Sequence, residues 1–587
     1  MTRRNYIGLS TTPHDSALAI VDEHGTVVFA EATERYLQSK RAINVAPDML
    51  YRTAQLVEEF CEPDTELVAA FSWSGNRERH HRALLQTIDS AEAALEKTFG
   101  AIPDYVLPEL IGGRHLLRSN LGMEYLSGEA LELELNRLPA WAGRPVLRRR
   151  YPHHLTHATA ACLTSPFEEA VCAVVDGYGE DSSYAFYRYR DGALSNVDDV
   201  RTHGLSLTGS LGQFYERICQ VCGFDAGAGE EWKVMGLAAY GHFDEGLYAL
   251  FREMLVVKDL TLQQVSESRK LGHWRELRRM RRKLGESPLI VADVAYTAQQ
   301  AFAAVLYELL NNLHSRELSS NLVLSGGCAL NSAANGAILE RTPFKSLHVF
   351  CAPADDGNAV GAALLAWRED HPEARVQTGF QTPYLGSRMS EQTLRNVRSF
   401  GAIANLVDCS GHAPEHAARL LAEGKVVGWI QGRAEFGPRA LGNRSILADA
   451  RLAAMKDQLN TTVKFREEFR PFAPSILHEH GPAWFEQYQP SPYMERALRF
   501  RPEVRDRVPA VVHEDGTGRL QTVRREWNER FYRLIRHFFE LTGVPLVLNT
   551  SFNVMGKPIA HSVEDVLAVF FSSGLHAVFI DDVLIEK

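Results

Sequence analysis

Cysteine is scarce in this chain, with eight residues scattered among 587. So few unpatterned cysteines argue against a disulfide scaffold and are typical of reduced thiols in a cytosol. Cys219 and Cys222 form one C-x-x-C pair, but no second pair with that spacing follows. We therefore expect both to be core thiols and not ligands of a structural zinc.

Long apolar runs and an excess of positive charge are also missing. No stretch looks long enough to span a bilayer, and Met-Thr-Arg-Arg-Asn leads at once into a strand-like segment, without the apolar core of a signal peptide. The net charge of −10 argues against a general nucleic-acid binder. We therefore expect a cytoplasmic protein with neither a membrane nor a nucleic acid as its partner.

One basic cluster departs from this balance, over residues 269–283. Only Trp274 interleaves its charges, so a solvated helix face is favoured over a nucleic-acid patch. Its members are Arg269, Lys270, Arg275, Arg278, Arg279, Arg281, Arg282 and Lys283.

The length predicts two or three domains. Residues 6–30 are predicted to form three short strands separated by a loop and a hairpin turn, and residues 170–192 repeat the strand–loop–strand pattern. Two such units predict an internally duplicated fold. Segments 46–62, 78–100 and 291–316 are expected to be helical, and 368–385 is expected to be a linker, with a change of composition beyond it.

A buried-type strand over 321–324 leads into Ser325-Gly326-Gly327, and a helix is expected over 329–339. Bare backbone N–H groups in such a turn could approach phosphate or ribose. A simple tight turn explains the pattern equally well.

His153 and His157 stand four apart in His-His-Leu-Thr-His, a spacing that places both imidazoles on one helix face. No carboxylate lies between them, unlike the H-E-x-x-H motif of metal-dependent proteases. Asp176 follows a predicted strand and Asp355 precedes a helix, so both carboxylates could join the pair. Such a set suits iron(II), zinc or manganese, whereas the alternative is a pair of surface or core histidines.

The C-terminal third holds cationic residues in segments punctuated by Gly, Asn or Pro. Arg forks and Lys ammonium groups bind phosphate or carboxylate, and their apolar neighbours favour charges that need a partner over plain surface charge. The set comprises Arg433, Arg439, Arg444, Lys464, Arg466, Arg470 and Arg519.

Together these segments resemble the NodU/CmcH/TobZ family of ATP-dependent O-carbamoyltransferases, over nearly the whole chain. The residues that carry the resemblance are His153–His157, Val175–Gly177, Lys233–Gly241, Ser325–Asn331, Glu435–Ser445, Lys464–Pro474 and Asn549–Asn553. The runs 435–445 and 464–474 are the most specific of these segments.

The resemblance implies an α/β chain with an N-terminal ASKHA-type duplicated domain, 1–370, and a C-terminal YrdC-like α/β domain, 386–587. The second would activate carbamoyl phosphate with ATP, accompanied by Mg²⁺, to carbamoyl-adenylate. The first would transfer the carbamoyl group to a hydroxyl of a small molecule, as in secondary-metabolite or antibiotic biosynthesis. A homodimer is also expected.

The resemblance also implies roles for single residues. His153, His157, Asp176 and Asp355 would bind Fe²⁺ or another divalent metal, with Asp356 as the alternative to Asp355. His14 would be the general base, and Lys40 would lie near the acceptor. Gly327 and Asn331 would contact carbamoyl-adenylate, and the ATP and carbamoyl phosphate ligands would be Arg439, Lys464, Arg470, Arg519 and Ser551.

Two other functions remain open. A transferase that threonylcarbamoylates tRNA would share the His pair, and the basic cluster favours it slightly. A non-catalytic nucleotide-binding ASKHA scaffold would need neither activation nor transfer residues.

Overall fold

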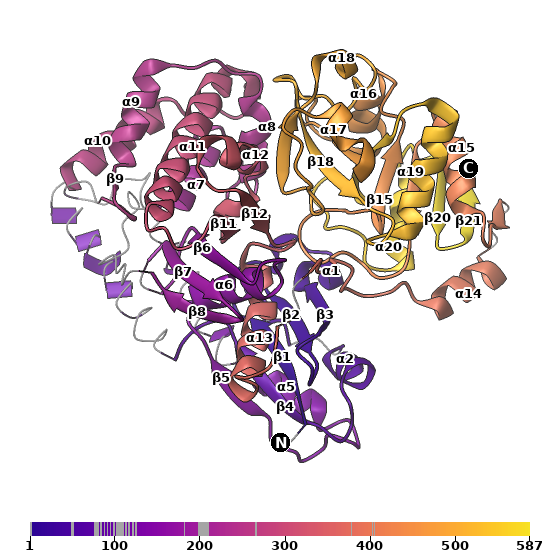
Figure 1. Cartoon of the computed structure of the whole chain (residues 1–587), viewed down its shortest axis with the longest axis horizontal. Helices are drawn as coiled ribbons and strands as arrows, with labels where there is room; N and C mark the ends of the chain where they lie inside the picture. Colours follow the sequence, from indigo (N-terminus) through magenta and orange to yellow (C-terminus); the bar gives the residue numbers. More distant parts are fainter. Residues whose placement is uncertain are drawn as a thin grey trace.

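A computed structural model of the chain describes residues 3–48, 52–75, 126–180, 182–197, 210–263, 267–376, 379–401, 403 and 405–587, with scattered positions between 82 and 123. These residues build two α/β parts that lie side by side in Figure 1. In the described residues, the N-terminal part carries two five-stranded sheets and a small two-stranded one, and the C-terminal part carries a nine-stranded sheet.

The first sheet has the order β3-β2-β1-β4-β5. β1 pairs antiparallel with β2 and parallel with β4. The three strands predicted over residues 6–30 are confirmed. The strands are β1 (Arg4–Ser10), β2 (Ala17–Val21), β3 (Val27–Ala32), β4 (Glu66–Phe71) and β5 (Leu147–Arg150).

The second sheet repeats this arrangement in the order β8-β7-β6-β11-β12. β6 pairs antiparallel with β7 and parallel with β11, as β1 does with β2 and β4. The duplication expected from the sequence is therefore present in the topology. The strands are β6 (Glu169–Val175), β7 (Tyr184–Arg190), β8 (Ala193–Asn196), β11 (Asn321–Ser325) and β12 (Ser346–Val349).

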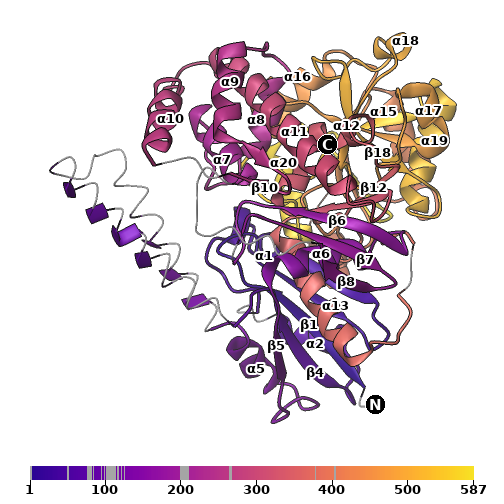
Figure 2. The ribbon, with the colours of Figure 1, turned by 60° about the vertical axis from the view of Figure 1, so that its left-hand side comes forward.

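Two helices, α6 (His153–Leu163) and α13 (Asn358–Asp370), lie between these sheets (Figure 2). α13 packs on β1, β2 and β4, α6 packs on β6 and β11, and the helices pack on each other. Glycines allow this approach: a Cβ at Gly361 would lie 1.9 Å from the Thr156 carbonyl oxygen. The close contact fixes where the N-terminal ends of both helices meet.

A helical layer covers the outer face of the second sheet. Its long helix α11 (Ala292–His314), confirmed as predicted, buries Phe302 and Val305 against residues of β6 and β11. Together with the preceding turn, the segment Pro288–His314 is long and apolar enough to cross a membrane, so the expectation that the chain has no such run was wrong. However, 61% of its most apolar stretch is buried inside the protein, as in a core helix. Cys219 and Cys222 are buried free thiols in this layer, as predicted.

The same layer carries the basic cluster on α10 (Glu267–Arg279) and the turn that follows it. Arg275, Arg278 and Arg279 are exposed, and Arg282 donates to the carbonyls of Cys222 and Gly223. These arginines therefore lie on an exposed face, and the choice of a solvated face over a nucleic-acid patch stays a prediction. The remaining elements of the layer are α7 (Leu211–Val221), α8 (Glu231–Ala238), α9 (Glu245–Met254), β9 (Val257–Lys258), β10 (Thr261–Leu262) and α12 (Ser332–Arg341).

The C-terminal sheet has the order β13-β21-β20-β14-β15-β19-β16-β18-β17. Helices α15 and α19 pack against each other beside it, and the hydrophobic core runs from Met389 to Ile585. Its strands are β13 (Leu406–Asp408), β14 (Val427–Ile430), β15 (Arg444–Ala448), β16 (Ala473–Leu477), β17 (Arg496–Arg499), β18 (Thr517–Val523), β19 (Leu546–Ser551), β20 (Ala577–Ile580) and β21 (Val583–Glu586), and its helices are α14 (Glu391–Phe400), α15 (Ala413–Ala422), α16 (Met455–Leu459), α17 (Gly481–Trp484), α18 (Pro502–Arg505), α19 (Glu529–Thr542) and α20 (Val563–Ser572).

The two parts are joined by close backbone contacts. α12 packs on β17, where a Cβ at Gly336 would lie 1.9 Å from the Ala497 carbonyl oxygen. The Arg35 guanidinium, in α1 (Thr33–Leu37), donates to the Gly437 carbonyl oxygen at 2.7 Å. The domain boundaries inferred from the family resemblance stay a prediction.

Two predicted helices differ from the outcome. Among the described residues of the segment expected over 46–62, the helix is α2 (Thr53–Phe60), and the buried Asp48 carboxylate before it accepts from Ser127 Oγ and Gly128 N. The segment expected over 78–100 falls largely outside the described residues. α5 (Glu129–Leu135) follows it.

We expect Gly361→Ala to destabilise the protein by about 2 kcal/mol, since the added Cβ would push α6 and α13 apart. Thermal or urea unfolding would measure this. Gly272→Ala, with no atom within 4 Å of its added Cβ, is the matched control and should be neutral or slightly stabilising. An equal stability for Gly361→Ala and the parent chain would contradict the packing argument.

Candidate metal and anion sites

Four predicted ligands converge at the junction of the two small sheets. His153 and His157 lie on the first turns of α6, Asp176 follows β6, and Asp355 opens the short turn before α13. Their ligand atoms all lie within 4.8 Å of one another, and all four side chains are buried or nearly so. This group, called here the His/Asp cluster, could hold a metal ion.

The spacing within the His/Asp cluster fits a shared cation better than direct ion pairs. His153 Nε2 lies 3.4 Å from Asp176 Oδ2 and 3.5 Å from Asp355 Oδ1, and His157 Nε2 lies 3.4 and 3.3 Å from the same oxygens. Charge-assisted hydrogen bonds would be about 2.8 Å long. A metal about 2.1 Å from each atom would separate tetrahedral neighbours by about 3.4 Å. Both Nε2 atoms are buried and lack a hydrogen-bond partner among the described residues.

The charges in the cluster favour a cation as well. Burial lowers the pKa of His153, but the adjacent carboxylates of Asp176 and Asp355 outweigh burial and raise that pKa to about 10. The pKa of His157 is raised for the same reasons. Burial would raise the pKa of Asp176, yet the two imidazoles hold it well below its usual range. Without a metal, protons on the imidazoles balance the two carboxylates, and a divalent ion would replace them.

Neighbouring groups fix the orientation of the ligands. The indole of Trp73 stacks on the His153 ring at 4.1 Å between centroids, and Asn358 Nδ2 lies 3.4 Å from His153 Nδ1. Glu180 bridges the backbone N–H groups of Ser74 and His153 at 2.8 and 2.9 Å. Such partners around the ligands hold a metal site in shape before the metal arrives.

The alternatives raised for this site are also placed. His154, assigned no ligand role, stays outside the His/Asp cluster, and burial together with His153 lowers its pKa to about 3. Asp355, and not the alternative Asp356, contributes to the cluster. Burial and the neighbouring carboxylates of Asp15 and Glu34 raise the pKa of Asp356 to about 7.

Gly327 and Asn331 make internal contacts. The Gly327 N–H donates to Asp176 Oδ1 at 3.0 Å and so positions a cluster carboxylate. The Asn331 amide exchanges two hydrogen bonds with Gln299, both 3.0 Å, and accepts from Ala334 N as the N-cap of α12. The helix expected over 329–339 therefore begins only at Ser332. Their roles toward carbamoyl-adenylate stay predictions.

His14 lies beside the His/Asp cluster, with Nδ1 3.9 Å from Asp355 Oδ2 and 2.9 Å from Asp15 Oδ2. Its side chain is 38% exposed, so solvent or a substrate can reach it. Lys40, in the same region, is 3.9 Å from Glu34 Oε1 and 44% exposed. The geometry suits the expected roles of a base and an acceptor contact without testing them.

Cationic side chains of the C-terminal part gather as the sequence predicted. Burial, followed by the charges of Arg439, Arg466 and Arg470, holds the pKa of Arg519 well below its usual range. Burial, followed by Arg466, Arg470 and Lys40, does the same for the pKa of Lys464. We name Arg439, Lys464, Arg466, Arg470 and Arg519 the cationic cluster. Several positive charges that repel one another at partly buried sites favour the binding of an anion.

Few described groups neutralise the cationic cluster. Lys464 Nζ donates to the Ser551 carbonyl at 2.8 Å and the Ser551 hydroxyl at 3.3 Å, which brings the predicted serine to the cluster. Arg470 pairs with Glu467 Oε2 at 3.2 Å. Among the described residues, the guanidinium Nε of Arg519 is buried without a hydrogen-bond partner. Arg433 and Arg444 instead donate to backbone carbonyls, so they hold loops in place.

A contact between the parts connects the cationic cluster to α8. The Arg470 guanidinium lies 3.9 Å over the Trp232 ring, and Lys233 Nζ donates to Glu467 Oε1 at 2.8 Å. Neither α8 residue was predicted to belong to a site. An aromatic beside a lysine on a helix gives no sequence signal for such a contact.

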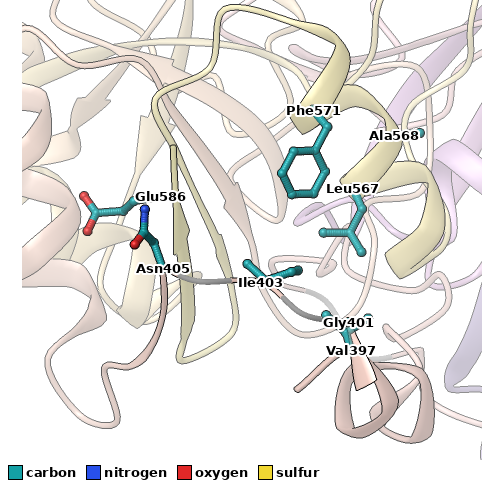
Figure 3. A pocket seen from close by; sticks show the side chains of 8 residues that line it. All are labelled: Val397, Gly401, Ile403, Asn405, Leu567, Ala568, Phe571 and Glu586. Carbon is teal, nitrogen blue, oxygen red and sulfur yellow. The ribbon is translucent and has the colours of Figure 1, made fainter. Parts of the chain in front are cut away.

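A separate cavity of 570 Å³ lies in the C-terminal part between α14, α20 and the end of β21 (Figure 3). None of its lining residues belongs to a predicted site. It is lined by Val397, Gly401, Ile403, Asn405, Leu567, Ala568, Phe571 and Glu586.

The sites thus define an α/β protein with a buried His/Asp cluster at the junction of two duplicated sheets and a cationic cluster in a second part. Comparison of the sequence with known families sharpens this class. The model described as Carbamoyltransferase N-terminus matches residues 5–364, and that described as Carbamoyltransferase C-terminus matches residues 418–587. The chain therefore belongs to the carbamoyltransferase family of enzymes.

Individual relatives agree. The chain is 30% identical over 564 residues to Nodulation protein U of Sinorhizobium fredii, covering 93% of each chain. It is 35% identical over 443 residues to Nodulation protein NolO of Bradyrhizobium diazoefficiens, covering 74% of this chain and 78% of that one. It is also 37% identical over 448 residues to Nodulation protein NolNO of Sinorhizobium fredii, covering 74% and 63% respectively.

Solved structures are more distant. Full-length HypF in its phosphate- and nucleotide-bound form is 12% identical, covers 64% of this chain and 57% of that one, and has a TM-score of 0.36. Component A of the Acidaminococcus fermentans (R)-2-hydroxyglutaryl-CoA dehydratase covers 62% and 99%, at 12% identity and a TM-score of 0.30. The family assignment rests on the sequence matches alone.

We expect metal affinity at the His/Asp cluster to rise with pH. His153, with its pKa raised to about 10, is protonated near neutral pH, so a metal must displace a proton. Affinity for Fe²⁺ or Zn²⁺ should therefore increase by about tenfold per pH unit for each proton displaced between pH 6 and 9. Calorimetric titration at several pH values would measure it.

His153→Ala should abolish stoichiometric binding. His242→Ala, whose side chain is 92% exposed, is the matched control and should bind like the parent chain. A pH-independent affinity, or full binding by His153→Ala, would contradict the assignment of these ligands.

Proposed function

We propose that the chain is an ATP-dependent O-carbamoyltransferase that carbamoylates a hydroxyl of a small-molecule acceptor. The observation that carries the proposal is the presence of two complementary sites in one carbamoyltransferase chain. The cationic cluster suits polyphosphate chemistry, and the His/Asp cluster with His14 beside it suits group transfer. The duplicated sheets support an ASKHA-type N-terminal domain, and the sheet that carries the cationic cluster supports a YrdC-like C-terminal domain.

Activation is assigned to the cationic cluster. Water would release phosphate from carbamoyl phosphate to leave carbamate, whose oxygen attacks the α-phosphorus of ATP and displaces pyrophosphate, giving carbamoyl-adenylate. Arg439, Arg470 and Arg519 supply positive charge where negative charge accumulates, and Lys464 adds a point charge. Mg²⁺ would accompany the ATP. Binding of phosphates would then explain why, among the described residues, Glu467 at Arg470 is the one carboxylate whose pairing with the cluster has been described.

Transfer is assigned to the His/Asp cluster. His153, His157, Asp176 and Asp355 would hold the metal, proposed to be Fe²⁺, which when bound supplies Lewis-acid polarisation and needs no water-activating Glu. His14 would take the proton of the acceptor hydroxyl as its oxygen attacks the carbamoyl carbon, and AMP leaves. Lys40, which is exposed, would meet the acceptor.

The acceptor is proposed to be a hydroxylated secondary metabolite, such as an antibiotic. We further propose a cytoplasmic protein, possessing neither a nucleic-acid nor a membrane partner, that forms a homodimer. A tRNA threonylcarbamoyl transferase is the competing function that the exposed basic face of α10 favours. It would require threonine and bicarbonate, whereas a nucleotide-binding scaffold would turn over neither substrate set.

Pyrophosphate release from ATP and carbamoyl phosphate, without any acceptor, tests the activation step. We expect release with carbamoyl phosphate and none with threonine and bicarbonate. The opposite preference would select the tRNA function, and no release with either pair would select the scaffold. A mass-spectrometric screen of hydroxylated metabolites for a carbamoyl addition would then identify the acceptor.

Arg519→Gln should separate activity from stability. Removing one of several repelling charges should leave the melting temperature unchanged or raise it, while pyrophosphate release falls about 100-fold. Arg499→Gln, an exposed arginine on the adjacent strand β17, is the matched control and should retain full activity. A destabilised but active Arg519→Gln variant would refute the anion site.

A further inference from the structure

His14 belongs to a hydrogen-bond network of three side chains. Its Nδ1 lies 2.9 Å from Asp15 Oδ2, and the same oxygen accepts from Arg41 Nη2 at 2.9 Å and from Arg41 Nε at 3.1 Å. Arg41 also donates through Nη1 to the Ala226 carbonyl at 3.1 Å. The network therefore connects the His14 loop, the segment around Arg41 and the loop before α8.

The backbone around this network is held in an unfavourable conformation. Asp15, Arg41, Ala42 and Asn44 all have positive φ angles, of 57°, 61°, 43° and 56°. Arg41 and Ala42 gain nothing from the local hydrogen bonding that lets Asp and Asn tolerate this region. Strain of this kind persists where the surrounding structure over-determines it, and it gathers at functional sites.

Backbone hydrogen bonds between the two segments hold this conformation in place. Asp15 N donates to the Arg41 carbonyl at 2.8 Å, and Asn44 N donates to the Pro13 carbonyl at 2.9 Å. Arg41 N donates to Glu34 Oε2 at 2.8 Å. Segment 38–44 is therefore fastened onto the loop that carries His14, and the Arg41 side chain is left in place over Asp15.

The ionised state of Asp15 favours one tautomer of the His14 imidazole. Burial raises the pKa of Asp15, but Arg41 and His14 bring it down to about 2, so this residue remains a carboxylate acceptor. A carboxylate at Nδ1 selects the tautomer with the proton on Nδ1. The other nitrogen, Nε2, then carries the lone pair, and it has no hydrogen-bond partner among the described side chains.

We propose that Asp15 and Arg41 are positioning residues of the transfer step, which fix His14 with Nε2 as the proton acceptor for the acceptor hydroxyl. The proposal rests on the proposed function. The hydroxyl proton moves to His14 Nε2 as the oxygen–carbamoyl bond forms, and the bond between the carbamoyl carbon and the AMP oxygen breaks with its electron pair on AMP. Nδ1 keeps its proton toward Asp15 throughout, and His14 then loses the new proton to solvent.

Two kinds of nucleophile, one that needs a general base and one that does not, distinguish a positioning role of Asp15 and Arg41 from a purely structural role. Alcohols, such as glycerol and a set of monosaccharides at high concentration, need a base. Hydroxylamine attacks with a lone pair that is already free, and would form hydroxyurea without one. The measurement is carbamoylated product by mass spectrometry for both nucleophiles, together with pyrophosphate release, on the full chain loaded with metal.

Asp15→Asn keeps a residue type that tolerates positive φ, but its amide no longer enforces the tautomer. We expect alcohol carbamoylation to fall about 10- to 100-fold, a share of the rate that a general base contributes. Transfer to hydroxylamine and pyrophosphate release should change less than about twofold. Arg41→Gln should show the same selectivity with a smaller loss.

Three further variants serve as controls for this experiment. Asp22→Asn, in the hairpin turn of the same sheet, where Asp22 Oδ1 accepts from His24 N and Thr26 N, is the matched control and should behave like the parent chain. His14→Ala and His14→Ala/Asp15→Asn should be equally poor with alcohols, because Asp15 acts through His14.

Equal losses with alcohols and hydroxylamine, no loss with either, or a further loss in the double variant would overturn the proposal. A parent chain that releases no pyrophosphate would instead refute the proposed function itself. A parent chain that releases pyrophosphate but transfers to neither nucleophile would refute the transfer step on which the positioning proposal rests.

Discussion

The burial of two carboxylates opposite two imidazoles is the constraint on which the N-terminal part depends. Uncompensated, such charges would be too costly to bury, so Asp176 after β6, the turn at Asp355 and the first turns of α6 must meet within a few ångströms. Glycines make this meeting possible, since Gly361 lets α13 approach α6 at Thr156. The duplicated sheets supply the symmetric frame that places both helix N-termini at one junction.

The C-terminal part solves the opposite electrostatic problem. Its cationic cluster has too few anions, and Glu467 divides its carboxylate between Arg470 of that cluster and Lys233 of α8. The same helix lays Trp232 against Arg470. The contacts of Lys233 and Trp232 thus hold one edge of the cationic cluster against the helical layer of the N-terminal part.

The strained backbone around His14 is likewise held by contacts between separate segments. Positive φ angles at Arg41 and Ala42 are tolerated because hydrogen bonds from Asp15 and to Glu34 fix the segment from both sides. On the proposal made above, the fold accepts a loss of stability to hold His14 in one orientation beside the His/Asp cluster. A histidine alone would rotate and exchange tautomers.

Local pattern and spacing determined much of this protein in advance: the repeated strand units, the long helix expected over 291–316, the His153/His157 pair and the arginines in segments rich in Gly, Asn or Pro. Periodicity and turn chemistry are properties of neighbouring residues, so they can be read along the chain. Only the tertiary structure decided between Asp355 and Asp356 as a cluster member, turned Gly327 and Asn331 toward internal partners, and brought Arg41, Trp73 and Glu180 to the site. Those choices depend on contacts between segments far apart in the sequence, where burial and charge balance are set by the packing of the whole fold.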